Sequence, residues 1–359
     1  MTRNHTPIPP KPARRSIVLV LQLLGFLIGL ALLAWCGKIA FSGENRDALK
    51  QLGEAPPLLM VSLILLSGLG VMLDGLTIWL VLRPVRRIQL SGMLATNALA
   101  TFLSLLPFKL SVMARIAIHR KRDGVPLAII GPWFAAVGAV LIASVAPVLL
   151  LAAWRPEIDL LWFVLLTASL ALSAAGLSIS AYAFSGKRGL RIIQSCAKRQ
   201  PIGLITNIAH SETFSLLDEG LAMLANFKNT LAAIGLRVAY IASIAARFFI
   251  ASRIVGSPMP ADQSLVGSVS YFFIGIVSPI GALGARERGA AEILEWFGQF
   301  DLNQLLLIVV VVTGAELLAN TALAAVGIAW LRPDRLIRGT GDLSSTDDNR
   351  TGQPEPDRR

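Results

Sequence analysis

Hydrophobic residues along this chain form long uninterrupted runs, and most of the charged residues lie in the short segments between them. A helical run of about 20 apolar residues is long enough to cross the roughly 30 Å hydrocarbon core of a bilayer. Neither the alternation of a half-buried strand nor the one-sided stripe of a soluble helix accounts for such runs. The eight runs cover residues 17–37, 57–82, 90–106, 125–153, 160–184, 231–250, 265–279 and 305–331. The pattern predicts an all-α, polytopic integral membrane protein.

Composition supports a membrane protein and disfavours two other classes. Hydrophobic residues make up 54% of the 359-residue chain and charged residues only 15%, whereas soluble proteins average about 25% charged residues. The formal net charge of +11 comes from basic residues in short blocks between the apolar runs. Such blocks are typical of the cytoplasmic face of a membrane protein. We therefore expect membrane lipids as partners, no nucleic acid, and no soluble core.

The positions of the basic blocks decide how many runs cross the membrane completely. If all eight crossed, the loops 109–122 and 187–199, with five basic residues in each, would both lie outside. Positively charged loops preferentially stay in the cytoplasm. If 90–106 and 265–279 instead enter and return as re-entrant hairpins, six full crossings remain and every strongly basic block faces the cytoplasm. This solution predicts a multi-pass protein of the bacterial inner membrane with both termini in the cytoplasm.

The six-crossing solution contains an internal symmetry. Residues 57–153 are predicted as a helix, a hairpin and a helix, and residues 231–331 as the same three elements in the opposite orientation. Two such units form an inverted-topology repeat, a common plan among transporters. The predicted organisation is a basic, proline-rich cytoplasmic tail (1–16), a transmembrane domain (17–331) with an amphipathic connector (202–229) between its repeats, and a disordered cytoplasmic tail (332–359).

Proline and glycine mark the tips of both predicted hairpins. Pro107 lies at the first turning point, and Pro279 lies at the second, followed by Gly281 and Gly284. Proline suits the first turn of a helix because its φ angle is fixed near the helical value and its missing N–H is not needed there. Each returning half-helix would therefore begin inside the bilayer, with free N–H groups and the positive end of its dipole at the tip.

Charged residues follow each predicted tip, at a depth where an unpaired charge is costly. Lys109 and Arg115 follow the first tip, and Arg286, Glu287 and Arg288 follow the second. Two half-helix N-termini with cations from both hairpins would form an anion site near the membrane midplane, suited to a lipid phosphate. The alternatives are that Arg115 extends to the cytoplasmic interface and that Glu287 only neutralises an arginine of a neighbouring helix.

Four further charged residues lie within the predicted full-length helices. Asp74 and Arg237 are expected toward the cytoplasmic side, and Arg247 and Glu316 toward the outer half. Ion pairing at matched depth is the simpler interpretation, because buried membrane charges usually pair. The alternative is that Asp74 or Glu316 carries a proton that is coupled to transport.

The sequence contains none of the patterns typical of soluble enzymes or metal sites. His5, His119 and His210 are scattered, and neither CxxC nor HExxH occurs. Cys36 and Cys196 are predicted at opposite sides of the membrane, so we expect no disulfide between them. We therefore expect no metal, no cofactor and no enzymatic activity.

The second hairpin resembles a known family motif. Residues 278–287 are Ser-Pro-Ile-Gly-Ala-Leu-Gly-Ala-Arg-Glu, followed by Gly298 and a long apolar run. This segment resembles the proline, glycine-glycine and Gly-x-Arg-Glu signature of the lysylphosphatidylglycerol synthase transmembrane-region family. The first hairpin, with Pro107, Lys109 and Arg115, is similar to that family's Leu-Pro-x-Arg-x-Gly-Glu-x-x-Arg region. The resemblance implies a flippase-like domain that acts on membrane lipids.

The sequence departs from the family pattern at two places. Ser111 and Val112 stand where the family usually has Gly-Glu, and Glu316 stands in a final helix where the family often has arginine. Only 28 residues follow Leu331 (359 minus 331), so the aminoacyltransferase domain of full synthases is not expected.

These observations predict a transporter that moves an anionic or phosphate-bearing lipid, or a lipid-linked precursor, between leaflets. Lys109 and Arg286 would contact the headgroup phosphate, and Glu287 would orient Arg286 or contact a cationic group. A second hypothesis is a non-transporting scaffold of envelope lipid or glycan synthesis, with envelope-biosynthesis proteins as partners. A third is an intramembrane lipid enzyme, for which only Ser278 beside Glu287 is available. A transporter should keep a hydrated cavity lined by the charges, whereas a scaffold should pair them and close the gap.

Overall fold

The described part of the chain is helical and contains no strand, which confirms the all-α fold. The computed structural model describes residues 23–24, 27, 30–31, 34–35, 38, 50, 53–106, 110–155, 157–185, 220–277, 284–297 and 302–332. The helices with defined bounds are α3 (Pro57–Leu82), α4 (Leu90–Leu103), α5 (Leu110–Arg122), α6 (Leu127–Trp154), α7 (Leu160–Phe184), α11 (Phe227–Ile254), α12 (Ala261–Val277), α13 (Ala285–Phe297) and α14 (Leu302–Leu331).

Five of these helices, α3, α6, α7, α11 and α14, are long and apolar enough to cross a membrane. They contain between 25 and 30 residues, which corresponds to about 37–45 Å of helix. The protein is therefore a polytopic membrane protein. The sixth predicted crossing, residues 17–37, lies largely outside the described residues.

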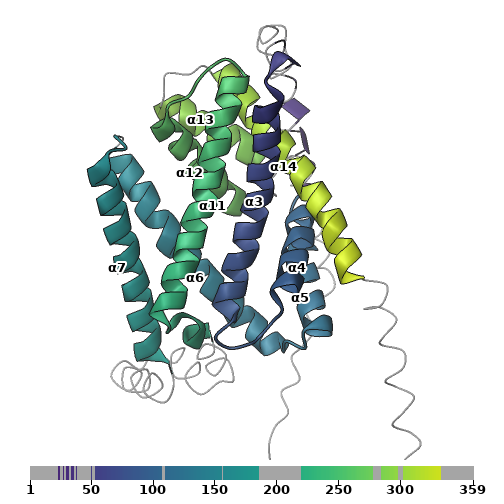
Figure 1. The fold of residues 1–359 in the computed structure, drawn as a ribbon, viewed down its shortest axis with the longest axis vertical. Helices are drawn as coiled ribbons and strands as arrows, with labels where there is room; N and C mark the ends of the chain where they lie inside the picture. The colour runs from purple at the N-terminus through teal and green to yellow at the C-terminus, as the bar shows by residue number, and fades with distance from the viewer. Residues whose placement is uncertain are drawn as a thin grey trace, which may run out of the picture.

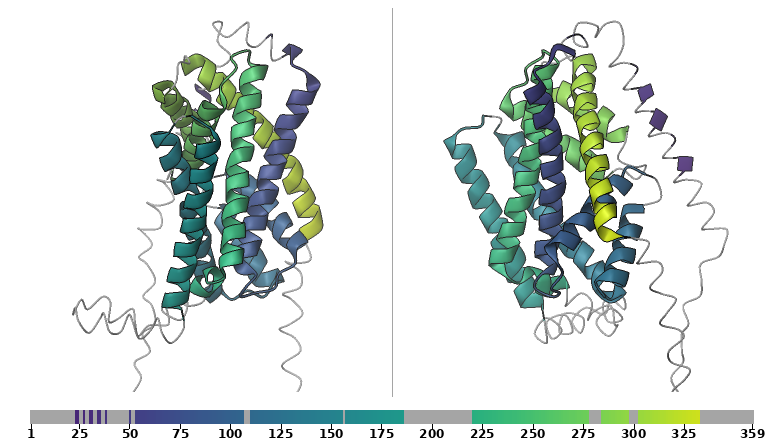
Figure 2. Two further views of the ribbon diagram at one scale, coloured as in Figure 1. Left: turned by 60° about the vertical axis from the view of Figure 1, so that its left-hand side comes forward. Right: turned by 45° about the vertical axis from the view of Figure 1, so that its right-hand side comes forward.

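The other four helices are too short to cross. α4, α5, α12 and α13 contain 14, 13, 17 and 13 residues, or about 20–26 Å of helix. Figure 1 shows α4 and α5 together at one end of the bundle and α12 and α13 together toward the other end, and Figure 2 agrees. These pairs occupy the places of the two predicted hairpins. Their entry into a bilayer and return stays a prediction, and the tips 107–109 and 278–283 lie outside the described residues.

A long helix, a short pair and a long helix occur twice along the chain. The first set is α3, α4 with α5, and α6, and the second is α11, α12 with α13, and α14. α3 and α11 lie side by side and run in opposite directions (Figures 1 and 2). This is the arrangement that an inverted repeat requires. Of the connector predicted at 202–229, only residues 220–229 are described.

Capping groups, rather than the limits of the apolar runs, set several helix ends. The side chain of Asn226 accepts a hydrogen bond from the backbone N–H of Asn229 at 3.2 Å, so α11 begins at Phe227, four residues before the predicted 231. Asp159 caps α7 in the same way. Asparagine and aspartate are favoured at this position because they satisfy a free N–H of the first turn. Hydropathy alone does not detect such polar first turns.

Three buried hydrophobic clusters hold the bundle together. One joins α3, α11, α12, α13 and α14 around Phe248 and Tyr271. A second joins α3, α4, α6, α7 and α11 around Trp133, and a third joins α6 and α7 to α11 and α12 around Trp162. The charged clusters described below therefore lie between rigidly packed helices.

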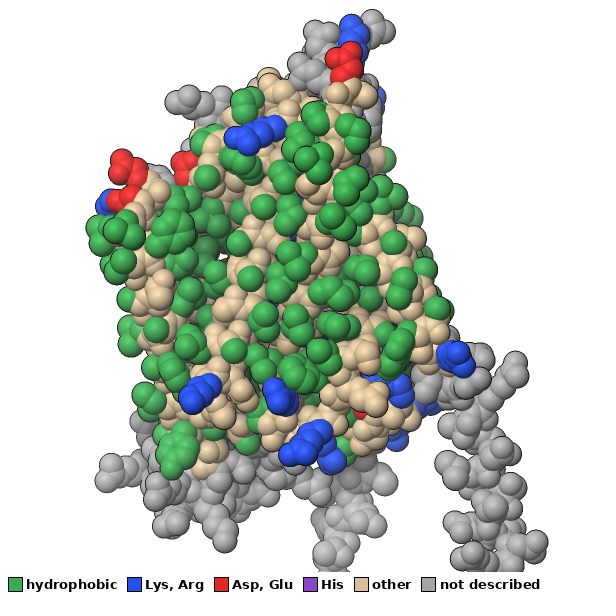
Figure 3. Space-filling model, viewed as in Figure 1, with side chains coloured by type: hydrophobic (Ala, Val, Ile, Leu, Met, Phe, Trp, Pro, Cys, Tyr) green, Lys and Arg blue, Asp and Glu red, His purple; other side chains and the backbone are tan. Residues whose placement is uncertain are grey.

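Charge divides the two ends of the bundle. Figure 3 shows most Lys and Arg side chains gathered at the end where α3 finishes, whereas acidic side chains together with a few basic ones lie toward the other end. Described basic residues at the first end, named the basic end, are Arg83, Arg86, Arg87, Arg120, Lys121, Arg122, Lys228 and Arg332. Acidic residues described at the opposite end are Glu54, Glu157, Asp159, Asp262, Glu292 and Glu295. Such an asymmetry is typical of a membrane protein whose basic end faces the cytoplasm.

Candidate functional site

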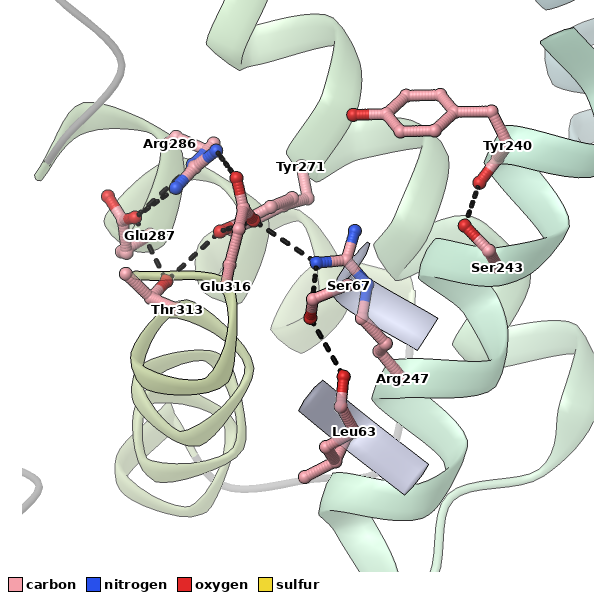
Figure 4. A network of polar contacts seen from close by, with 10 residues as sticks. All are labelled: Leu63, Ser67, Tyr240, Ser243, Arg247, Tyr271, Arg286, Glu287, Thr313 and Glu316. Carbon is pink, nitrogen blue, oxygen red and sulfur yellow. Dashed lines mark hydrogen bonds and ion pairs between the residues drawn. The ribbon is translucent and has the colours of Figure 1, made fainter. Parts of the chain in front are cut away.

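Six polar side chains meet in the half of the bundle that contains α12 and α13 (Figure 4). This group, named the α13 cluster, consists of Arg247 of α11, Tyr271 of α12, Arg286 and Glu287 of α13, and Thr313 and Glu316 of α14. Figure 4 shows the two arginines on opposite sides of Glu316. Residues up to 69 positions apart in the sequence are thus brought into one network.

Both carboxylates of the α13 cluster are paired with arginine. Arg286 donates from Nη1 to Glu316 Oε1 at 3.1 Å and from Nη2 to Glu287 Oε1 at 3.1 Å. Arg247 donates from Nη1 to Glu316 Oε2 at 3.2 Å, and the same nitrogen lies 3.3 Å from Ser67 Oγ on α3. Glu316 therefore bridges two guanidinium groups from two helices of the second repeat, α11 and α13.

Hydroxyl and aromatic groups complete the network. The Tyr271 hydroxyl donates to Glu316 Oε2 at 3.1 Å, and the Thr313 hydroxyl donates to Glu287 Oε1 at 3.0 Å. The guanidinium of Arg286 lies over the Tyr271 ring, 4.1 Å from its centre, which is a cation–π contact. Each carboxylate thus has both arginine and hydroxyl donors.

The α13 cluster is neutral and almost completely buried. Its two arginines and two glutamates carry formal charges that sum to zero. The exposed fraction is zero for Glu287, 2% for Arg247 and 7% for Arg286. Buried charges are tolerated when they are paired and hydrogen-bonded. Arg286, a predicted headgroup ligand, thus binds Glu287 and Glu316, and Glu287, the other predicted ligand, binds Arg286 and Thr313.

The local sequence explains the position of Glu287. Gly284 precedes α13 with a φ of 83°, a left-handed conformation that favours glycine. The backbone N–H of Gly284 donates to Glu287 Oε2 at 2.5 Å. A glutamate at the third helical position that reaches back to the N-cap N–H forms half of a capping box. Gly284 and Glu287 therefore shape the start of α13.

The remaining predicted residues near the hairpin tips are not part of the α13 cluster. Arg288 forms an exposed ion pair with Glu292 at 2.6 Å and lies 5.0 Å from the ring centre of Trp35. It points away from the cluster, toward the first apolar run. Outside the described residues lie Pro107, Lys109, Pro279 and Gly281.

A second group, named the α5 cluster, lies nearer the basic end. It consists of Asp74 on α3, Asn97 on α4, Arg115 on α5 and Arg237 on α11. Asp74 Oδ1 accepts from Arg237 Nη1 at 2.7 Å, and Asp74 Oδ2 lies 3.8 Å from Arg115 Nη2. Arg115 Nη2 also donates to Asn97 Oδ1, which is fixed because Asn97 Nδ2 donates to the backbone oxygen of Val71.

The α5 cluster has more positive charge than negative. One aspartate faces two arginines, so its four members carry a formal charge of +1. Arg115 Nη1 and Arg237 Nε are buried and have no acceptor among the described residues. The side chain of Asp74 is 22% exposed, so the cluster is not sealed. Unused guanidinium donors with surplus charge match the oxygens of a phosphate or carboxylate.

Tyr240 lies on α11 between the two clusters. The guanidinium of Arg237, one turn away, is 5.5 Å from the centre of its ring. In Figure 4 the hydroxyl end of Tyr240 is turned toward the α13 cluster. A Cβ atom at Gly70 of α3 would lie only 3.0 Å from Tyr240 Cε2, so α3 and α11 approach closely here. α11 therefore carries one arginine of each cluster with an aromatic ring between them.

A polar contact at the basic end fixes the helix that carries Arg115. His119 is fully buried against Trp133, and its Nδ1 lies 2.7 Å from Asp123 Oδ2. Arg122 donates to Asp123 Oδ1 at 2.9 Å and to the backbone oxygen of Gly92 on α4 at 3.2 Å. Burial opposes ionisation of Asp123, but the hydrogen bonds from His119 and Arg122 outweigh it and lower its pKa.

Sequence reasoning missed Asn97, His119 and Asp123. A signal for Asn97 was present, because an amide in the apolar run 90–106 must find partners when it is buried. Arg115 was assigned to a site with Lys109 and Arg286, whereas the structure brings it to Asp74. Among the described residues, no three His, Cys, Asp or Glu side chains come together in the manner of a metal site.

Comparison with known proteins identifies a single broad relationship. No curated protein and no solved structure matches this chain. The family model described as the lysylphosphatidylglycerol synthase TM region matches residues 22–324. This range contains all the helices from α3 to α13 and most of α14. The match covers both repeats and both charged clusters. The chain therefore belongs to the lysylphosphatidylglycerol synthase transmembrane-region family, whose members are membrane proteins related to lipid handling.

Proposed function

We propose that this protein moves an anionic or phosphate-bearing lipid, or a lipid-linked precursor, between the leaflets of the bacterial inner membrane, and that it acts as a transporter rather than an enzyme. Family membership supports a role in lipid handling. The repeated and inverted order of helices is the plan of many secondary transporters. The charged groups within the bundle supply a path for a headgroup that the hydrocarbon core would otherwise exclude.

The observation that carries the proposal is the surplus positive charge of the α5 cluster. Arg115 Nη1 and Arg237 Nε are buried donors without acceptors, and a buried unpaired donor is costly. A headgroup phosphate would supply the missing acceptors and bring the charge toward zero. Headgroup recognition is thus assigned to Arg115 and Arg237, with Lys109 retained as a candidate from the same hairpin.

The proposed orientation has the basic end in the cytoplasm, six full crossings and both termini inside. Single cysteines in a background free of Cys36 and Cys196 test it. A cysteine at Lys121 should react with a membrane-impermeant maleimide only from the cytoplasmic side, and a cysteine at Glu157 only from the outside. Outside labelling at Lys121 together with cytoplasmic labelling at Glu157 would contradict the proposed topology, because eight full crossings predict that result. Labelling of both from one side would mean that α6 does not cross.

Transport itself is tested in proteoliposomes that contain a fluorescent phosphatidylglycerol analogue and an impermeant quencher added outside. Arg115→Ala should slow leaflet exchange by about tenfold or more, since a hydrogen bond to a charged group contributes roughly 1.5–3 kcal/mol. Arg115→Lys should give an intermediate rate, because it keeps the charge and loses the two-pronged geometry. Arg253→Ala is the matched control, since Arg253 is exposed on α11 outside both clusters and its guanidinium lies over the ring of Phe249, 3.8 Å from the ring centre.

Two outcomes of this assay would count against the proposal. Unchanged exchange in Arg115→Ala would remove the α5 cluster from the headgroup path. The scaffold hypothesis would be favoured if the wild-type protein, inserted in either orientation, exchanged the fluorescent lipid between leaflets no faster than protein-free vesicles do. The closed, neutral α13 cluster is the observation that favours a scaffold, because a scaffold needs paired charges and no hydrated cavity. A scaffold should instead co-purify with envelope-biosynthesis proteins.

A further inference from the structure

An apolar pocket lies between α6, α12 and α13, in the half of the bundle away from the basic end. Its volume is about 240 Å³. α6 contributes Leu149, α12 contributes Val266 and Phe273, and α13 contributes Ile293 and Trp296. The only hydroxyl in the lining is that of a single serine of α12. The pocket therefore offers a ligand dispersion contacts and almost no hydrogen bonds.

The size and lining of this pocket select the class of ligand. An apolar cavity of about 150 Å³ stays dry and accepts a molecule as large as benzene, so this larger pocket is suited to a hydrocarbon rather than to water. Leu149 and Phe273 are more than one-third exposed, and Trp296 is 83% exposed, so the rim opens on the outer surface of the bundle. That surface faces acyl chains in a membrane. Tryptophan, such as Trp296 here, is also common at the membrane interface, where lipid acyl chains meet the headgroups.

The equivalent interface in the other repeat contains a close approach of two backbones. In the inverted repeat, α6 corresponds to α14, and α12 corresponds to α4. A Cβ atom at Gly327 of α14 would lie only 2.8 Å from the backbone oxygen of Ala95 on α4. α14 and α4 are therefore in backbone contact, whereas α6 packs on α12 through side chains of the third hydrophobic cluster. The two corresponding interfaces thus differ in how closely their backbones approach.

The wall of the pocket that α12 and α13 form is tightly packed. A Cβ atom at Gly289 of α13 would lie 2.7 Å from Ile274 Cδ1 of α12, and one at Gly275 of α12 would lie 3.1 Å from Arg286 Cδ of α13. The α12–α13 pair is thus close-packed and joined to the α13 cluster. α6 forms the opposite wall and is held against α12 by the third hydrophobic cluster.

We propose that this pocket binds one acyl chain of a membrane lipid and holds that lipid against the α12–α13 pair, beside the α13 cluster. The inference deepens the proposed function and rests on it, because the acyl chain is the part of a transported lipid that never leaves the hydrocarbon region. In this assignment α6, α12 and α13 hold the acyl chain of the lipid, and Arg115 and Arg237 of the α5 cluster recognise its headgroup.

Photocrosslinking tests the site directly. The purified full chain is placed in vesicles that contain phosphatidylglycerol with a diazirine at the end of one acyl chain, and crosslinked residues are located by mass spectrometry. Crosslinks should concentrate on Leu149, Val266 and Ile293. Phosphatidylcholine with the same chain should give the same positions, because the pocket recognises the chain. Labelling spread evenly over the exposed residues of α7 would overturn the proposal.

A pocket-filling substitution gives the second test. Val266→Trp should lower crosslinking at the other lining residues by at least about fivefold, since overfilling a packed site displaces its occupant. Val164→Trp, on the exposed surface of α7, is the matched control and should leave crosslinking unchanged. Ala152→Leu is a milder filling variant if Val266→Trp does not fold. Wild-type crosslinking in a folded filling variant would contradict the site.

The two proposals fail in distinguishable ways. Crosslinking measures binding at equilibrium and needs no transport. Loss of crosslinking on filling, together with no lipid exchange in the wild type, would leave a lipid site on a protein that does not transport. Unchanged crosslinking on filling, together with an exchange rate that depends on Arg115, would leave a transporter whose acyl chain lies elsewhere.

Discussion

The α13 cluster and the α5 cluster share helix α11, yet they differ in charge. α11 supplies Arg247 to the first and Arg237 to the second. α3 supplies Asp74 to the second and touches the first only through Ser67, which lies beside Arg247. In the α13 cluster, two arginines meet two carboxylates. In the α5 cluster, two arginines meet one. In this bundle, buried arginines are therefore balanced by carboxylates in one cluster and outnumber them in the other.

The difference has an energetic basis. Desolvation of a buried charge is offset only when partners are well placed, and removal of one partner of a buried pair costs about 3–5 kcal/mol. In the α13 cluster both carboxylates are paired with arginine, so the network stabilises the contact of α13 with α11 and α14. Buried guanidinium nitrogens without an acceptor among the described residues occur in both clusters: Arg247 Nε in the α13 cluster, and Arg115 Nη1 and Arg237 Nε in the α5 cluster. Only in the α5 cluster do the arginines outnumber the carboxylates. An anion would be bound there without the loss of an existing partner.

The largest expected effect is on stability. Glu316→Gln leaves Arg247 without a carboxylate and Arg286 with Glu287 alone, so the free energy of unfolding should fall by about 3–5 kcal/mol. The midpoint of thermal unfolding in detergent measures this loss. Glu292→Gln is the control, because its pair with Arg288 is exposed and such pairs contribute about 0.3–0.5 kcal/mol. If the Glu316→Gln protein unfolds at the wild-type temperature but no longer exchanges lipid, the α13 cluster would be the one that acts in transport rather than in stability.

A smaller effect, on transport alone, follows from the charge of the α5 cluster. Asn97→Asp keeps the shape of the side chain and adds a carboxylate beside Arg115, which makes the cluster neutral like its counterpart. Exchange of fluorescent phosphatidylglycerol should slow by about tenfold, the equivalent of 1.4 kcal/mol. Stability should change little, because the new ion pair offsets the lost hydrogen bond to Val71.

Asn229→Asp makes the same chemical change at the start of α11, outside both clusters. It should leave exchange at the wild-type rate. Faster exchange in Asn97→Asp would mean that the surplus charge retains the lipid rather than recruits it, and the assignment of the headgroup site would then have to move.

Much of the fold could be predicted from the sequence because hydrophobic length and basic blocks report directly on membrane crossing. The runs 57–82 and 160–184 coincide with α3 and α7. The start of α11 could not be found in this way, because it depends on a polar cap at Asn226. Hydropathy averages over a run, whereas a cap is a single hydrogen bond.

The candidate site was predicted less completely, for a geometric reason. Charges at membrane depth are visible in the sequence, and the ion pairs Asp74–Arg237 and Arg247–Glu316 join residues assigned to matched depths. Which arginine lies at which carboxylate depends on helix rotation and on the close approach of backbones at positions such as Gly70 and Gly327. These contacts are not encoded in spacing along the chain. Arg115 was consequently grouped with Arg286 rather than with Asp74.

The smallest expected effect concerns the support of α5 at the basic end. Because hydrogen bonds from His119 and Arg122 outweigh burial and lower the pKa of Asp123 below its ordinary value of 3.8, ionised Asp123 stabilises the folded state. That contribution is fully present above the unfolded pKa and is lost as the pH falls through the lower, folded pKa. Asp123→Asn should therefore unfold at a slightly lower temperature than the wild type at neutral pH, and the difference should shrink below about pH 4.

The unfolding midpoint in detergent, measured across this pH range for both proteins, checks the prediction, and Glu157→Gln in the loop before α7 serves as the control at the opposite end. A difference between Asp123→Asn and wild type that is the same at every pH would mean that the carboxylate acts through shape and not through charge. In that case Arg115 is positioned by packing of His119 on Trp133 alone. If the difference does vanish in acid, the same titration should loosen α5, and lipid exchange should become more sensitive to acid than the stability of the α13 cluster.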